Sequence, residues 1–142
     1  MFNQGLSLDQ APPISVPFRF FLTAPIFGVV ISFVLFFTPF SESSNQYSYF
    51  AIGLVHLFTL GILSMIIFGA MQQMMPVLAG AVIKKPRLFA NIVHTSLVLG
   101  TLFLSFSFIL ELKNLLYFGV IFLAIAFLTC FSTSIKLLFN VK

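Results

Sequence analysis

The chain has 142 residues, of which 60% are apolar and only 7% are charged. A soluble domain of this size cannot bury so much apolar surface, because small domains keep a large surface for their volume. The net charge of +4 comes from Lys and Arg residues at segment ends that form no basic patch, so we expect no nucleic-acid partner. The composition predicts a membrane protein whose main contact is the lipid bilayer.

Four apolar stretches follow one another along the chain. They cover residues 20–40, 47–80, 88–110 and 115–138. Each is at least about 20 residues long, which lets an α-helix cross a hydrocarbon core of about 30 Å. Four segments are too few to close a transmembrane barrel, so helices alone can satisfy the backbone. We therefore predict one all-α domain over residues 1–142, an integral membrane four-helix bundle.

The basic residues predict the orientation of this bundle. Lys113 falls on one side of a four-span chain, whereas the other six fall on the opposite side. Connections rich in Lys and Arg stay in the cytoplasm. We therefore expect both termini to be cytoplasmic, in a multi-pass protein of the inner (cytoplasmic) membrane. The six residues are Arg19, Lys84, Lys85, Arg87, Lys136 and Lys142.

Prolines predict where helices start or break. Pro12, Pro13 and Pro17 predict an extended lead-in before the first span. The second apolar stretch is longer than a bilayer needs. We therefore expect it either to tilt beyond the bilayer or to break near Pro76 and Gly80, since proline removes a backbone donor.

One of the two histidines, His56, lies about nine residues into the second stretch, in its outer half. An ionisable side chain inside a span is costly and is therefore a candidate for function. The alternative is a structural histidine that hydrogen-bonds another helix. On a helical wheel Tyr49, Gly53, Leu60 and Leu63 share the face of His56. Gly53 leaves room there for a flat group or for a neighbouring helix.

The second histidine, His94, lies in the inner half of the third span. Asn91, Thr101 and Ser105 fall within about 60° of it on a helical wheel, which makes one polar stripe. Such a stripe should face protein or a wet cavity rather than lipid. A ligand role and a hydrogen-bonding role are equally compatible with this position.

The remaining chemistry is limited to soft ligands. Thioethers at Met71, Met74 and Met75 can bind Cu(I), although apolar packing explains these methionines more simply. There is no HExxH, CxxC or Ser/His/Asp pattern, so we predict no catalytic residue. The three acidic residues lie outside the spans, which argues against a proton-coupled transporter. Two imidazoles with thioethers suit haem iron or copper.

The sequence around His56 resembles the haem–copper oxidase subunit I superfamily, which includes the nitric-oxide reductases. The resemblance rests on His56 itself, on GAMQQMMPVLAGA at 69–81, on KPRLFAN at 85–91 and on SVPFRFFLTAPIFG at 15–28. It covers residues 15–100 loosely. Proteins of that superfamily have twelve spans in three four-helix arcs, and the second helix of an arc carries metal-ligating histidines in its outer half.

The resemblance implies that this chain corresponds to one arc and that His56 is an axial ligand of b-type haem (haem b). The superfamily's active site needs several histidines and a copper ion, whereas this chain has two histidines. We therefore expect electron transfer or O2/NO binding rather than oxygen reduction by one protomer. Whether the chain is an oxidoreductase in its own right stays open, as does its respiratory-chain redox partner.

The expected depths of the histidines predict an oligomer. If the spans enter the bilayer at Tyr49 and Leu88, His56 and His94 differ in depth by about 10 Å. One iron is then hard to reach from both, so we expect a dimer or trimer in which symmetry brings copies of His56 to one haem. The alternative hypotheses are an accessory or assembly subunit of a respiratory complex with structural histidines, and an oligomeric copper-binding protein.

Overall fold

The computed structural model describes residues 11–39, 45–79 and 83–140. Each of the four expected spans is a helix long and apolar enough to cross a membrane. The first span is α1, the second consists of three consecutive helical elements, and the third and fourth are α5 and α6. The elements are α1 (Ser15–Phe37), α3 (Tyr49–His56), η2 (Leu57–Ser64), α4 (Met65–Ala79), α5 (Pro86–Ile109) and α6 (Lys113–Asn140).

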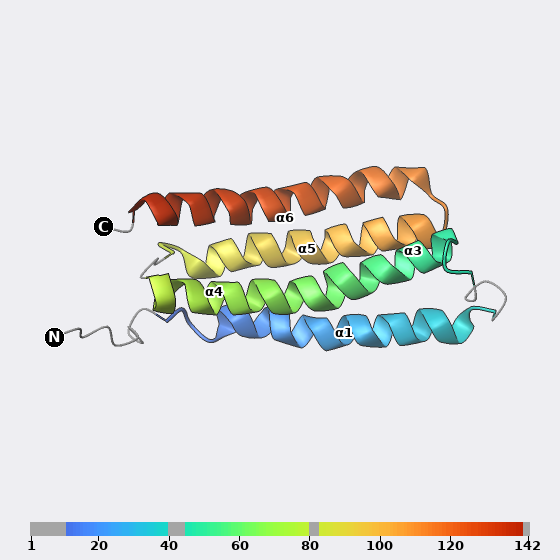
Figure 1. Ribbon diagram of the computed structural model, residues 1–142, viewed down its shortest axis with the longest axis horizontal. Coiled ribbons are helices and arrows are strands. Elements are labelled where there is room, and N and C mark those ends of the chain that lie inside the picture. Colours follow the sequence, from blue (N-terminus) through green and yellow to red (C-terminus); the bar gives the residue numbers. More distant parts are fainter. Residues whose placement is uncertain (1–10, 40–44, 80–82, 141–142) are drawn as a thin grey trace.

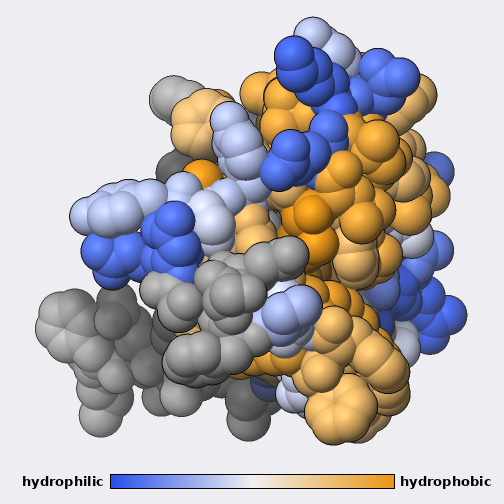
Figure 2. Space-filling model, turned by 90° about the vertical axis from the view of Figure 1, so that its right-hand side faces the viewer, coloured by the Kyte–Doolittle hydropathy of each residue, from blue (hydrophilic) through white to orange (hydrophobic). Residues whose placement is uncertain are grey.

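The four spans run side by side with alternating direction (Figure 1). The helix α5 packs against α6 and α3, while α1 packs along η2 and α4. The start of α1 and the end of α6 lie at one end of the bundle, together with the connection that enters α5. Figure 2 views the opposite end, where hydrophilic residues surround apolar surface. The predicted all-α bundle of four membrane-length helices is confirmed.

The first helix begins earlier than the sequence predicted. It starts at Ser15, so Pro17 lies in its first turn and is not part of an extended lead-in. A proline fits there because the first backbone amides of a helix have no carbonyl partner within the helix. Pro25 lies inside α1 as well and does not end it.

Of the two alternatives expected for the second span, a break at Pro76 does not occur within the residues that the structure describes. Pro76 lies inside α4, which continues to Ala79, and Gly80 lies outside the described residues. The irregular part of the second span is instead η2, an eight-residue π-helix that directly follows His56. A π-helix turns by less than 100° per residue, because it has more residues per turn. The helical wheel that grouped Leu60 and Leu63 with His56 therefore fails beyond His56.

One face of the second span is buried along its length. Phe50 and Gly53 are buried before η2, Leu57 and Gly61 within it, and Met65 and Phe68 after it. These residues follow one another at intervals of three or four, the spacing of one helix face. The second span therefore presents one continuous side to the core, although its helix type changes at η2.

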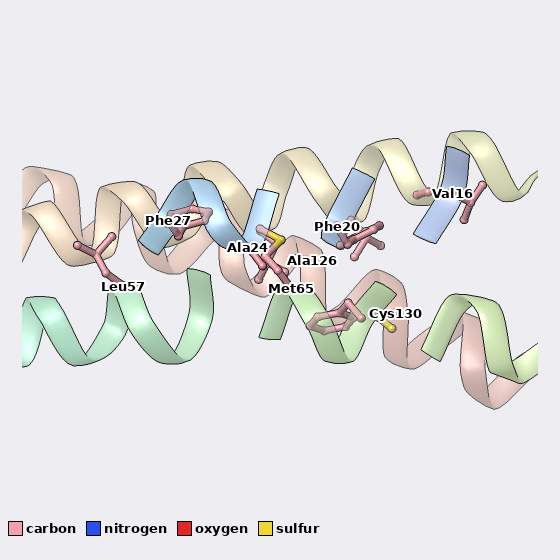
Figure 3. Packing of buried hydrophobic residues seen from close by; sticks show 12 residues of the cluster. Val16, Phe20, Ala24, Phe27, Leu57, Met65, Ala126 and Cys130 are labelled. Carbon is pink, nitrogen blue, oxygen red and sulfur yellow. The ribbon is translucent and has the colours of Figure 1, made fainter. Parts of the chain in front are cut away.

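The core consists of apolar side chains from all four spans. Figure 3 shows residues of α1, the second span and α6 meeting between the helices. The first helix contributes every third or fourth residue, the spacing of one helix face. These side chains are Val16, Phe20, Ala24 and Phe27, and they pack with Leu57, Met65, Ala126 and Cys130.

The turn between α5 and α6 contains an unusual residue. Glu111 has a φ of 54°, in the left-handed region, where glycine is the usual residue. The backbone N–H of Leu112 donates to the carbonyl of Ser107 (2.9 Å), and that of Glu111 donates to Phe108 (3.3 Å). This pair of bonds is the Schellman arrangement that ends a helix. A side chain at this position costs about 1 kcal/mol relative to glycine.

Candidate functional site

The ring of His56 is held by its own helix. Its Nδ1 lies 2.7 Å from the backbone carbonyl oxygen of Ile52, one turn earlier. A carbonyl only accepts, so Nδ1 carries a proton and donates it. In a neutral imidazole the lone pair is then on Nε2. Histidines that bind metal commonly have this arrangement, in which one ring N–H is anchored to an oxygen and the other nitrogen is left for the ligand.

The plane of the His56 ring is set by an aromatic stack. Phe108 of α5 lies against it, with ring centroids 5.3 Å apart and an angle of 22° between the planes. Tyr49 also stacks on Phe108, with ring centroids 6.5 Å apart and an angle of 19° between the planes. The three rings join α3 to the end of α5. His56 is half-buried, and its neighbour Val55 is 58% exposed, so the ring lies near the outer surface of the bundle.

Gly53 brings α3 close to α5. A Cβ atom built there would lie 2.5 Å from Cγ1 of Ile109 and 2.8 Å from the backbone carbonyl oxygen of Ser105. The space beside Gly53 is therefore filled by the neighbouring helix, which is one of its two predicted uses. A direct role of Gly53 in cofactor binding stays a prediction.

The other histidine, His94, joins α5 to α1. Its Nε2 lies 2.8 Å from the Thr23 hydroxyl, which donates its single proton to the carbonyl of Arg19 (2.8 Å). The hydroxyl must therefore accept from His94, so Nε2 carries a proton and Nδ1 is the remaining nitrogen for a ligand. Phe20 packs edge-on against the ring at 5.0 Å. Arg19 also hydrogen-bonds Asn91, one turn before His94.

The polar stripe of α5 faces protein, as predicted for two of its members. Thr101 and Ser105 are fully buried, and their hydroxyls have no hydrogen-bond partner within the described residues. Other hydroxyls in the spans, such as that of Thr23, donate to a carbonyl of their own helix. Gln72 of α4 is likewise 2% exposed with both amide atoms unpaired in the described part of the chain.

The structure keeps the two histidines apart. His56 stacks on Phe108 of α5. His94 lies on α5 too, 14 residues before Phe108. This corresponds to about 21 Å along α5 at 1.5 Å per residue. The separation exceeds the predicted 10 Å for two reasons. The helix α5 has 24 residues, about 36 Å, and is longer than the bilayer core assumed for the prediction, and His56 lies beside the last turn of α5 instead of about 11 Å inside the boundary. A single metal ion cannot bind both side chains of one protomer.

Metal ligands do not cluster elsewhere in the part of the chain that the structure describes. Among residues 11–39, 45–79 and 83–140, no group of three or more His, Cys, Asp and Glu side chains could hold a metal ion. The thioethers are dispersed too, because Met71 packs on the core, Met75 lies 3.9 Å from the Ser134 hydroxyl, and Met74 is 48% exposed. Packing accounts for these methionines.

Two contacts of the histidines were not predicted from the sequence. The contact of Thr23 could have been predicted, because Thr23 is a polar residue in an otherwise apolar part of the first span. Nothing in the sequence distinguishes Phe108 from the other phenylalanines of a chain that has 21 of them. Its place follows from the register between α3 and α5, which Gly53 sets by allowing their close approach.

Comparisons of this chain with protein-family models, with curated proteins and with solved structures found no match. The resemblance to haem–copper oxidase subunit I therefore stays a prediction from the sequence.

Proposed function

We propose that this chain is a membrane b-type haem protein in which His56 is an axial ligand and copies of the chain share the haem. The observation that carries the proposal is the hydrogen bond from His56 Nδ1 to the Ile52 carbonyl, which leaves the Nε2 lone pair for iron. The stack on Phe108 fixes the ring plane as well. His56 lies in the half of its span where the superfamily that it resembles has haem ligands.

The position of His56 favours a haem between copies. The ring is half-buried next to exposed apolar side chains, with Val55 58% and Phe58 49% exposed. A porphyrin on this side of the bundle would lie against that apolar surface, and a second copy could cover it. His94 is about 21 Å away along α5 and cannot complete the ligand set within one protomer. A symmetric dimer or trimer supplies further copies of His56 at one depth.

A bound haem would supply one-electron redox chemistry and affinity for O2 or NO. The residues of the chain would ligate it through His56 and hold the ring plane through Phe108. They would also exclude water, because the surrounding side chains are apolar. In this proposal His94 is a structural residue that joins α1 to α5 through Thr23.

The proposal includes the predicted topology. The positive-inside rule puts both termini in the cytoplasm, in the inner membrane, and His56 in the half of the bilayer opposite to them. An electron donor or acceptor of the respiratory chain would then approach from the outer side.

A second hypothesis is an accessory or assembly subunit with two structural histidines. It is favoured by the fact that both histidines have a hydrogen-bond partner within the chain, namely Ile52 and Thr23. Such a subunit would bind a larger complex and carry no cofactor. A purely copper-binding oligomer through His56 lies between the two hypotheses.

An absorption spectrum of the purified protein separates these hypotheses. We expect a Soret band and a reduced-minus-oxidised difference spectrum of b-type haem, either as isolated or after incubation with haemin. Metal analysis of the same sample would detect copper. A colourless protein that binds neither haemin nor copper would contradict the haem proposal and support the accessory subunit.

A further inference from the structure

The turn between α5 and α6 forms one side of a small surface cavity. The cavity has a volume of about 230 Å³ and lies at the end of the bundle opposite to the start of α1. Its lining combines apolar, aromatic and polar side chains. They are Leu112 and Leu116, Tyr49 and Phe108, and Ser107, Glu111 and Lys113.

Glu111 and Lys113 bring opposite charges to this cavity. Both side chains are exposed, and no ion pair joins them or involves either of them within the part of the chain that the structure describes. Lys113 is also the one basic residue of the sequence on its side of the predicted membrane. Each charge is therefore available to a ligand that carries the opposite charge.

Both charges stand at the helix ends where they are least favourable. Glu111 follows the carbonyl end of α5, which carries a partial negative charge, and Lys113 begins α6, which carries a partial positive charge. Glu111 also occupies a backbone conformation that favours glycine. Three local preferences for stability are thus broken within three residues, and such concentrations mark functional positions.

The broken preferences define the chemistry of the missing partner. A ligand with a cationic group would be stabilised by Glu111 and the carbonyl end of α5. A phosphate in the same ligand would be stabilised by Lys113 and by the hydroxyl of Tyr49. A neutral ligand would satisfy neither charge, and a purely anionic one would be repelled by Glu111.

We infer that this cavity binds the zwitterionic headgroup of an aminophospholipid such as phosphatidylethanolamine. The primary ammonium donates hydrogen bonds to the Glu111 carboxylate, and the phosphate accepts from Lys113. The glycerol and upper acyl chains lie along Leu112 and Leu116, which continue into the apolar surface of α6. The membrane boundary, where the ends of these spans lie, supplies such lipids at high concentration. This inference does not depend on haem binding.

Native mass spectrometry can test the inference. The detergent-purified protein is incubated with equal amounts of dioleoyl phosphatidylethanolamine, phosphatidylcholine and phosphatidylglycerol, and the lipids that stay bound are counted. We expect phosphatidylethanolamine to be retained about fivefold more than either other lipid. A preference of this size corresponds to the contribution of roughly one exposed ion pair to the binding free energy. Phosphatidylcholine lacks the N–H donors, and phosphatidylglycerol lacks the cation.

Variants assign the preference to the two charges. Glu111→Gln should abolish the preference over phosphatidylcholine, and Lys113→Gln should lower retention of all three lipids. Lys136→Gln, which removes a charge at the other end of the bundle, is the matched control and should change nothing. Glu111→Gly removes the carboxylate but suits the left-handed backbone, so it should raise the melting temperature while losing the lipid preference.

Three results would overturn the inference. The first is equal retention of the three lipids by the unmodified protein. The second is an unchanged preference in both Glu111→Gln and Lys113→Gln. The third is stronger retention of phosphatidylglycerol or of an added neutral isoprenoid hydroquinone. Either result would show that the site does not select its ligand through the opposite charges of Glu111 and Lys113.

Discussion

At the scale of single residues, the two histidines differ in the nitrogen that each leaves available. The Nε2 of His56 keeps its lone pair because Nδ1 donates to the Ile52 carbonyl, whereas the Nε2 of His94 donates to Thr23. A sequence pattern places an imidazole on a helix but does not choose between its two nitrogens. Each histidine thus keeps one nitrogen without a proton, Nε2 in His56 and Nδ1 in His94. We propose His56 as the ligand because its ring lies beside exposed apolar side chains.

The contribution of the hydrogen bond between His94 and Thr23 to stability can be measured by removing the bond. Thr23→Val removes the acceptor and leaves the buried side of His94 unpaired, so it should destabilise the protein by about 0.6 kcal/mol, the mean for hydrogen bonds between membrane helices. Thr101→Val is the matched control, since its hydroxyl has no partner in the described part of the chain. We expect the control to be neutral or stabilising, because an unpaired buried hydroxyl is removed. Unfolding in mixed micelles would show both effects, and equal destabilisation by the two variants would contradict the account.

At the scale of the elements, the sequence predicted the four spans well. Hydropathy placed the third span at 88–110, close to the observed Pro86–Ile109. The start of α1 was missed by five residues because Arg19 and Pro17 resemble a boundary, although the long Arg19 side chain can reach Asn91 and the proline fits a first turn. The π-helix was not predictable, because apolar residues on all sides of a span hide its periodicity.

The close packing of α3 on α5 predicts how Gly53 responds to substitution. Gly53→Ala would force Cβ against a backbone carbonyl, that of Ser105, so we expect destabilisation of about 1–3 kcal/mol. Gly28→Ala in α1 is the control, because its Cβ would meet only Cδ1 of Ile62 at 3.9 Å. The control should be neutral or stabilising by up to about 1 kcal/mol, since alanine favours helix. Thermal melts of both variants in the same detergent would decide, and a harmless Gly53→Ala would show that α3 does not hold its observed distance from α5.

At the scale of the whole molecule, the composition predicted a membrane bundle, and the four helices agree with it. The separation of the histidines could not be derived well from span boundaries, because an error of a few residues at each end changes the depth by several ångströms. The structure places them farther apart than predicted, so one iron cannot reach both histidines of a single protomer.

The predicted topology can be tested by labelling. Single cysteines at Lys85 and Asn114, in a Cys130→Ala background, lie at opposite ends of the bundle. A membrane-impermeant maleimide added to intact spheroplasts should label position 114 and spare position 85, because the basic connection stays in the cytoplasm. Both positions should react after the membrane is opened. Labelling of position 85 alone would show that the orientation is the reverse of the predicted one and that His56 lies in the cytoplasmic half of the bilayer.

Native mass spectrometry of the haem-loaded protein can test whether copies of the chain share one haem. It should show dimers or trimers with fewer haems than chains, because each iron uses His56 from two copies. His56→Ala protein should keep its helices and its membrane insertion, which depend on apolar length. A monomer with one complete bis-histidine haem would contradict the shared site.

Haemin titration of the unmodified protein, His56→Ala and His94→Asn shows whether His56 ligates the iron. We expect a saturable low-spin spectrum for the unmodified protein and for His94→Asn, and no low-spin band for His56→Ala. Circular dichroism on the same samples should show equal helix content, so that a loss of haem is not a loss of fold. An unchanged low-spin spectrum in His56→Ala would contradict the claim that His56 ligates haem.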